Sequence, residues 1–209
     1  MDFSYTEEQQ MLQDSVQKFV QNSYDFDTRN TIIASDDGYS LENWQLFAEL
    51  GWLTVPFSEA DGGFGGSAVD LIVMMEAFGK ANLVEPFTPT AILGGGLVAA
   101  LGTDAQKAEL LPRVMDGSLQ LACAYAESTS RFNLASVSTS AESDADRLVI
   151  NGSKVAVLNG PSADKLLVVA RESGATTDRS GISVFLVDSE SEGVSVQAYT
   201  NVDGKRAAR

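Results

Sequence analysis

The sequence contains no histidine, and this absence removes several kinds of active site. A Ser-His-Asp or Cys-His nucleophile system cannot be assembled, and the commonest zinc-ligand sets are missing as well. Cys123 is the single cysteine, so an intrachain disulfide is impossible, and between two alanines it is expected to be a buried small hydrophobe. Any chemistry must therefore depend on carboxylates, hydroxyls or a bound cofactor, and no metal site is predicted.

Basic charge and long apolar runs are also scarce. The chain has 14 Lys and Arg residues against 29 Asp and Glu residues, a formal net charge of −15. This balance argues against nucleic acid as a partner, because proteins that bind it present a basic surface. No run approaches the roughly 18 apolar residues of a membrane-spanning helix, and the N-terminus is acidic, unlike a signal peptide. We therefore expect no membrane insertion and a cytoplasmic location.

The first part of the chain has the apolar spacing of helices. Five stretches show it, namely residues 6–20, 40–50, 67–80, 90–102 and 103–115. The tract 22–38 between the first two is polar and ends in Asp-Asp-Gly, a turn signal. Three glycines, Gly94, Gly95 and Gly96, interrupt the fourth helix at a cost of roughly 1 kcal/mol each, so another element is expected to approach closely there. The helix at 67–80 is apolar nearly all round and should be buried.

From Ser118 onward the spacing becomes that of short strands separated by turns. Strands are predicted at residues 148–150, 154–158, 166–170, 182–187 and 194–198. Asn151-Gly152 is expected to join the first two in a hairpin, and the Ser/Thr/Glu tract 136–146 is expected to be a loop. The predicted fold class is α+β, with an all-helical N-terminal domain (residues 1–117) followed by an antiparallel β-barrel or sandwich domain (residues 118–209).

Several stretches of the chain resemble the acyl-CoA dehydrogenase family. In the helical part they are FAELGWLTVPFSEADGGFGG, DLIVMMEAFGKA and LGTDAQKAELLPRVMDGSLQLACAYAE; in the β part they are LVINGSKVAVLNGPSADKLLVVAR and GISVFLVDSESEGVSV. Glu127, Gly152, Lys154, Asn159 and Gly160 carry the resemblance to the family's flavin-bearing strands. Within the family, the chain is similar to the small subunits of pimeloyl-CoA dehydrogenase.

The resemblance implies an oxidoreductase of fatty acid metabolism that uses FAD to oxidise the α,β bond of an acyl-CoA and passes electrons to an acceptor. Such enzymes are homo- or hetero-oligomers, and a carboxylate on a C-terminal four-helix domain removes the α-proton. That domain is absent here, so no catalytic residue is predicted in this chain. Because the chain ends at Arg209 in a basic turn, we expect a truncated fragment with an incomplete middle domain, inactive alone.

The resemblance also implies a set of cofactor-binding residues: Tyr125, Ala126, Glu127, Thr129, Ser130, Arg131, Ala156, Val157 and Leu158. The chain departs from the family at several of them. Ala126-Glu127-Ser128 stands where Thr-Glu-Pro is usual, and Ala156-Val157-Leu158 replaces Trp-Ile-Thr, so an aromatic ring and two hydroxyls are lost. Backbone N–H groups could still bind the flavin edge, and Thr129, Ser130 or Arg131 could reach the pyrophosphate.

Two other functions remain open from the sequence. One is a non-catalytic partner subunit with an eroded flavin site, and the other is a small apolar-ligand binder built on the β part.

The roles of several single residues also remain open. Glu76 and Glu85 are predicted to be solvated or capped charges rather than an acid–base pair. Tyr125 either faces the flavin or packs in the barrel, and the Met74-Met75 pair is core or lines an acyl-chain cavity.

Overall fold

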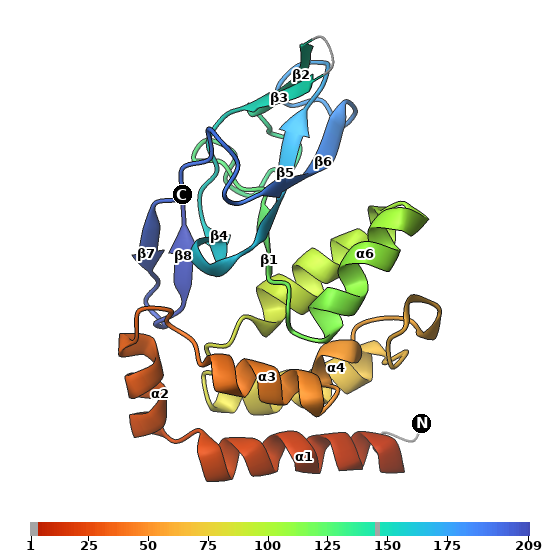
Figure 1. Cartoon of the computed structure of the whole chain (residues 1–209), viewed down its shortest axis with the longest axis vertical. Helices are drawn as coiled ribbons and strands as arrows, with labels where there is room; N and C mark the ends of the chain where they lie inside the picture. Colours follow the sequence, from red (N-terminus) through yellow and green to blue (C-terminus); the bar gives the residue numbers. More distant parts are fainter. Residues whose placement is uncertain (1–3, 145–146) are drawn as a thin grey trace.

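The computed structural model describes residues 4–144 and 147–209, which form a helical half and a β half (Figure 1). The helical half contains α1 (Glu7–Ser23), α2 (Phe26–Ala34), α3 (Leu41–Glu49), η1 (Trp52–Thr54), η2 (Glu59–Asp61), α4 (Ala68–Lys80), the π-helical η3 (Thr88–Gly95), α5 (Gly96–Leu101) and α6 (Asp104–Met115). No helix among the described residues is both long and apolar enough to span a bilayer.

Side-chain caps begin most of these helices. Thr6, Ser67 and Thr103 each form a capping box, in which the cap side chain and the third helical residue satisfy each other's backbone N–H groups. The predicted helices in these regions are confirmed. The polar tract 22–38 contains a further helix that no apolar spacing indicated, since Asp25 accepts a hydrogen bond from Thr28 N at 2.8 Å and begins α2.

An aromatic cluster forms the core of the helical half. Phe19, Trp44, Phe47, Trp52 and Phe78 are all at most 6% exposed. Phe47 stands at the centre, with its ring centroid 4.9 Å from that of Trp52 and 5.6 Å from the stacked ring of Phe78. Aromatic pairs add about 0.5–1.5 kcal/mol beyond the burial of their area. The cluster therefore fixes α4 against α1 and α3.

The glycines in the fourth predicted helix lie where that helix meets the β half. A Cβ on Gly94 would stand 2.5 Å from the Cβ of Leu121, and one on Gly95 would stand 2.4 Å from Cζ of Phe57. At Gly96 nothing lies within 4 Å of such an atom. The close approach is thus confirmed for the first two glycines and absent at the third. It lets η3 pack directly on the strand that contains Leu121.

The β half contains β1 (Leu121–Ala124), β2 (Ser140–Asp144), β3 (Arg147–Asn151), β4 (Val157–Leu158), the turn η4 (Gly160–Ser162), β5 (Lys165–Arg171), β6 (Ile182–Asp188), β7 (Ala198–Thr200) and β8 (Arg206–Ala208). One sheet has the order β1-β5-β2-β3, with β6 pairing with β5, and a second has the order β4-β8-β7. The predicted α+β organisation is confirmed. β5 pairs in parallel with β1 and β2, and the described strands form no closed barrel.

Four details of the predicted β half are wrong. The strand expected at residues 194–198 is not formed at 194–197, and β7 begins at Ala198. The tract expected to be a loop contains β2, which pairs antiparallel with β3; residues 145–146 lie outside the described part. The expected strand 154–158 is reduced to β4, because Ala156 has a φ of 53° and interrupts the extended backbone. Asn151-Gly152 does not close a hairpin, since β4 pairs with β8 instead of β3.

Strand β1 joins the two halves because its two faces pack on different partners. Leu121 and Cys123 belong to the apolar cluster formed with α5 and α6, while Ala122 and Ala124 pack within the β half. Burial raises the pKa of the Cys123 thiol to about 11. Cys123 is therefore a packing residue, as predicted, and is not ionised near neutral pH.

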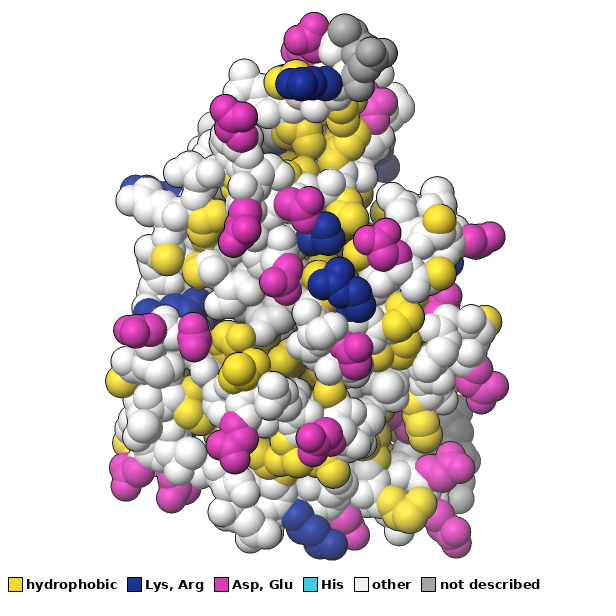
Figure 2. Space-filling view, in the orientation of Figure 1, with side chains coloured by type: hydrophobic (Ala, Val, Ile, Leu, Met, Phe, Trp, Pro, Cys, Tyr) yellow, Lys and Arg dark blue, Asp and Glu magenta, His cyan; other side chains and the backbone are white. Residues whose placement is uncertain are grey.

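Two arginines fasten the β7–β8 hairpin to the helical half. Arg29 of α2 donates to the backbone carbonyl of Asp203 in the hairpin turn, and also to Asn82 O at 2.7 Å. In the opposite direction, Arg206 donates to Ser35 O at 2.9 Å. Figure 1 shows the hairpin reaching down to α2. On the face seen in Figure 2, acidic side chains are dispersed over both halves rather than gathered in one patch.

Candidate functional site

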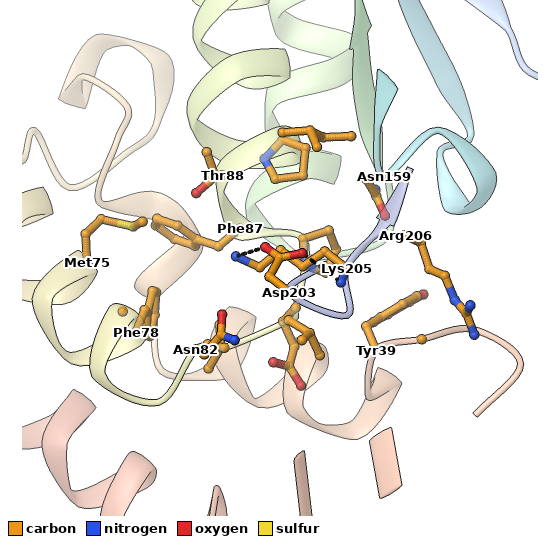
Figure 3. Close-up of a pocket in the computed structure, with 18 of the residues that line it drawn as sticks. Tyr39, Met75, Phe78, Asn82, Phe87, Thr88, Asn159, Asp203, Lys205 and Arg206 are labelled. Carbon is orange, nitrogen blue, oxygen red and sulfur yellow. Dashed lines mark hydrogen bonds and ion pairs between the residues drawn. The ribbon is translucent and has the colours of Figure 1, made fainter. Parts of the chain in front are cut away.

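A cavity of about 210 Å³ lies where the helical half, the hairpin and β4 meet (Figure 3). Residues 82–89, which connect α4 to η3, form most of one wall. The β half contributes Leu158 and Asn159, and the hairpin contributes residues from its turn. Pockets that hold drug-sized ligands usually measure 300–1,000 Å³, so this one suits a small group.

The deep side of the cavity is apolar. Met75, Phe78 and Phe87 line it, and in Figure 3 they lie together on the side opposite Asn159. The two adjacent methionines of α4 have different roles, since Met74 is fully buried in the core and only Met75 reaches the cavity. The core interpretation is therefore confirmed for Met74, while Met75 lines a cavity.

A chain of polar side chains crosses from the helical half to the β half beside the cavity. Gln120 donates from Nε2 to the hydroxyl oxygen of Tyr39 at 2.7 Å. Asn159 donates from Nδ2 to Gln120 Oε1 at 3.0 Å and to Thr90 Oγ1 at 3.4 Å. Burial raises the pKa of Tyr39, so its phenol stays neutral. This network fixes Asn159, and with it the neighbouring Leu158, at the cavity wall.

Glu85 is a buried carboxyl in the cavity wall, only 3% exposed. Asn43 donates to its Oε1 at 2.9 Å, while Oε2 has no hydrogen-bond partner among the described residues. Burial raises the pKa of Glu85 above its usual range. The prediction of a solvated charge is thus wrong for Glu85. It is right for Glu76, which is exposed and pairs with Lys80 at 2.8 Å.

Replacing Glu85 by glutamine is expected to stabilise the protein above neutral pH, by on the order of 1 kcal/mol. The folded-state pKa lies above the unfolded one, so the wild-type contribution is complete below the ordinary glutamate pKa and is lost as pH rises through the folded-state value. Urea unfolding from pH 4 to 9 measures the effect. The exposed control Glu76→Gln should follow the wild-type pH profile, and an identical profile for Glu85→Gln would refute the prediction.

Glu127 is one of the predicted flavin residues, and its carboxylate is engaged in contacts within the protein. Its Oε1 accepts from Lys154 Nζ at 2.7 Å and from Thr139, and its Oε2 accepts from Ser138 N at 2.8 Å. Burial alone would raise the pKa of this carboxyl, but these hydrogen bonds outweigh burial and hold the pKa at about 2. The carboxylate therefore stays ionised and fully hydrogen-bonded.

The loop after Glu127 contains the predicted pyrophosphate residues. Ser130 is buried, and its hydroxyl bonds the backbone of Glu127, accepting from N at 3.1 Å and donating to O at 2.9 Å. Thr129 and Arg131 are exposed, and Arg131 has a φ of 48°. Of the three, only these two have side chains free to meet a ligand.

The remaining predicted flavin residues lie at the ends of β1 and β4, which contact each other. Tyr125 is 45% exposed and Leu158 is 38% exposed, so Tyr125 does not pack in the core. Val157 is buried, and Ala126 and Ala156 present only methyl groups. Leu158 is the one predicted flavin residue that also lines the cavity.

These residues fit a flavin as a mainly apolar wall. Leu158 and Tyr125 provide exposed apolar surface, and small side chains at Ala126 and Ala156 leave room beside it. The exposed Arg131 is a positive charge that could meet a pyrophosphate, and Lys154 neutralises the negative charge of Glu127. Among the described residues, no cluster of His, Cys, Asp and Glu could hold a metal ion.

Family models match both halves of the chain. The model described as "Acyl-CoA dehydrogenase, N-terminal domain" matches residues 6–118, and the one described as "Acyl-CoA dehydrogenase, middle domain" matches residues 122–209. The chain belongs to the acyl-CoA dehydrogenase family. The helical half and the β half are thus the N-terminal and middle domains of this family.

Similar proteins include other members of the acyl-CoA dehydrogenase family. Acyl-CoA dehydrogenase FadE12 of Mycobacterium tuberculosis is 32% identical over 96% of this chain and 51% of its own length. Among solved structures, the "Tcur3481-Tcur3483 steroid ACAD G363A variant" has a TM-score of 0.85 and 28% identity over 97% of this chain and 54% of its own. The "FAD complex of PigA" has the same fold, with a TM-score of 0.87 and 23% identity over 100% and 56%. The chain spans about half the length of these relatives.

Most of the residues that line the cavity could not be predicted from the sequence. Residues 82–89 show only a helix break at two prolines, and no periodic pattern marks Tyr39, Gln120 or Glu85 as neighbours of β4. The only available signal was Pro86 and Pro89 themselves, since prolines so close together force a fixed connection between two helices. The positions of the cavity residues depend on contacts between the two halves.

Proposed function

We propose that this chain is the N-terminal and middle part of a flavin-dependent acyl-CoA dehydrogenase, which desaturates the α,β bond of an acyl-CoA thioester. The observation that carries the proposal is the position of Leu158. This residue lies in the segment that the family resemblance assigns to the flavin, and it also lines the apolar cavity. A small acyl group in the cavity would therefore lie next to the flavin wall.

The residues of this chain would bind and orient the reactants. Met75, Phe78 and Phe87 would hold the acyl group away from water, and the polar network through Asn159 would keep the wall in place. Tyr125, Leu158 and the backbone near Ala126 would face the flavin, with Thr129 and Arg131 toward its pyrophosphate. The chemistry supplied by bound FAD is acceptance of the β-hydride.

We assign the α-proton base to no residue of this chain. Glu85 is the one buried carboxyl at the cavity, and its Oε1 is engaged by Asn43 while its Oε2 is covered by protein. The base would come from a part of the protein equivalent to the remaining half of the longer relatives. Electrons would leave to a protein acceptor, and the cytoplasmic enzyme would be a homo- or hetero-oligomer.

Leu158→Asp is expected to weaken FAD binding about tenfold or more, because a carboxylate would face an apolar ring and an anionic pyrophosphate. Titrating FAD against the purified chain and following flavin fluorescence quenching measures the dissociation constant. Leu148→Asp is a matched control, since Leu148 is 47% exposed on β3 in the other sheet. Equal affinities for the two variants would argue against flavin contact at β4.

A second candidate function is a non-catalytic partner subunit in a hetero-oligomeric acyl-CoA dehydrogenase. It is favoured by the internal use of Glu127 and Ser130 and by the lack of hydrogen-bonding side chains at residues 156–158. Mixing this chain with a separately purified partner distinguishes the two functions. A partner that gains dehydrogenase activity while this chain binds no flavin would support the second function.

A further inference from the structure

We propose that Glu127 and Lys154 form a positioning pair that holds together the two segments facing the flavin, residues 125–131 and 155–158. The inference rests on the proposed function, because it concerns the same flavin site. Neither side chain needs to touch the cofactor. Each would act by fixing the backbone of a segment that touches the cofactor.

Both charged side chains are buried and form an ion pair with each other. The Lys154 and Glu127 side chains are 8% and 6% exposed, and Nζ lies 2.7 Å from Oε1. The same carboxylate accepts from Thr139 N at 3.0 Å, from Thr139 Oγ1 at 2.7 Å and from Ser138 N at 2.8 Å. Three of these four donors lie around Oε1 and one on Oε2, and the carboxylate is buried, so Glu127 is engaged mainly by the protein itself.

The pair lies directly beside a backbone link between the same two segments. Val155 N donates to Ala126 O at 2.9 Å, so residues 126–127 are joined to residues 154–155 once through backbone and once through side chains. Immediately afterwards the chain passes through Ala156 at a φ of 53°, which is unfavourable for a residue with a Cβ. Fixed contacts before it and the pairing of β4 with β8 after it hold this conformation.

The charge of the pair matters as well as its geometry. Thr129 and Arg131, which we assign to the pyrophosphate side, follow Glu127 within four residues. Without Lys154, the buried negative charge of Glu127 would be uncompensated and would repel an anionic cofactor. Loss of the lysine should therefore weaken FAD binding through charge in addition to any loosening of the loop.

The rest of the β half has an independent anchor. Arg171 donates from Nε to Val137 O at 3.1 Å and from Nη2 to Ala135 O at 2.8 Å, so the far end of the loop is held without the pair. Disrupting Glu127 and Lys154 should consequently loosen residues 125–131 and 155–158 more than it loosens β5 and β6.

The test uses the full chain, with FAD itself as the probe. Lys154→Met is expected to raise the dissociation constant for FAD about tenfold or more, the size of effect that supporting residues have on other bound groups. Lys154→Arg keeps the charge and should recover most of the affinity. Lys80→Met is the matched control, because it breaks an ion pair of similar length, 2.8 Å, that is exposed on α4. It should leave the dissociation constant unchanged.

Amide hydrogen exchange provides a readout that does not need the cofactor. In Lys154→Met, exchange should accelerate at residues 125–131 and 155–158 while β5 and β6 remain protected. If this variant does not fold, Glu127→Gln replaces it, because glutamine has the same shape, removes the charge and keeps one of the two oxygens that accept from Ser138 N and Thr139 N. The same loss of local protection is expected. FAD affinity should also fall, but by less than in Lys154→Met, because this variant loosens the two segments without leaving a negative charge beside the anionic cofactor.

The outcomes separate this inference from the proposed function. If the wild-type chain binds FAD and both charge-removing variants bind it equally well, the positioning role is wrong while the proposed function stands. If the wild-type chain binds no FAD, flavin binding by this chain fails, and hydrogen exchange decides the inference. Faster exchange confined to the two segments would support coupling by the pair, and unchanged or uniformly faster exchange would overturn it.

Discussion

Arg171→Met is expected to lower the free energy of unfolding by about 4 kcal/mol or more, which is exceptional for one substitution. Arg171 is 8% exposed, and the five N–H groups of its guanidinium make six hydrogen bonds, with one N–H of Nη2 shared between two acceptors. All six acceptors are backbone carbonyl oxygens, which belong to Ala135, Val137, Ser173, Thr176, Asp178 and Ser180. Methionine fills a similar space but donates no hydrogen bond. The buried carbonyl of Val137 would lose its donor at a cost of about 1–3 kcal/mol, and the other five carbonyls, which are only partly buried, would each lose a hydrogen bond to a charged group. Two loops and the start of β2 lose their common anchor.

Urea unfolding monitored by circular dichroism would measure this effect at neutral pH. Arg147→Met is the control, since Arg147 is an exposed residue of β3, and its substitution should change stability by no more than about 0.5 kcal/mol. Arg171→Lys should fall between the two, because an ammonium has three donors where the guanidinium has five. Similar midpoints for Arg171→Met and the control would contradict a structural role for the carbonyl cluster.

Gly94→Ala is expected to destabilise the protein by about 2–3 kcal/mol, although alanine is the better helix former. The added Cβ would stand 2.5 Å from the Cβ of Leu121, and neither atom can rotate away, because each is fixed by its own backbone. The clash between the two atoms can be relieved only if η3 moves away from β1. Since η3 is continuous with the segment that lines the cavity, the cavity should also change shape.

Gly96→Ala is the matched control for this prediction. It lies two residues further along the same helical run, where a new Cβ would have nothing within 4 Å, so it should stabilise the chain by up to about 1 kcal/mol. Thermal unfolding of both variants checks the pair. Equal changes in melting temperature would show that helix propensity, and not the approach of β1, governs this segment.

Helix starts could be predicted from the sequence because their signals are local. Thr6, Ser67 and Thr103 each carry a partner three residues later that completes the cap. The helix α2 has no apolar stripe that would mark it, and its stability depends on Asp25 at its start and on Arg29, whose contacts lie 53 and 174 residues away. Periodicity could not have found those partners.

The β half shows the same division between local and distant causes. β5 and β6 have strongly apolar sequences and were predicted nearly to their ends. β2 was missed because its sequence, SAESD, is polar, and backbone pairing with β3 defines it. The strand that contains β4 was predicted too long, because no local signal indicates that Ala156 takes a positive φ. Such a conformation is set by its surroundings, here the pairing of Lys154 with Glu127 and of β4 with β8.

For the candidate site, the family resemblance predicts a region of the chain but not the state of each side chain in it. The carboxylate of Glu127 accepts hydrogen bonds from Lys154, Thr139 and Ser138. These contacts form only when three separate segments of the chain have folded together. The cavity is a consequence of the same assembly, because its walls come from both halves of the chain.

The two arginine contacts between α2 and the β7–β8 hairpin have a consequence for the order in which the protein forms during synthesis. They join residues 171 and 174 positions apart, so α2 cannot gain them until residues 203–206 have left the ribosome. Contacts of such sequence separation form late, because a long loop must first be closed. The nascent helical half should therefore expose the buried Arg29 and the wall at Asn82, and only the arrival of the hairpin would complete the cavity.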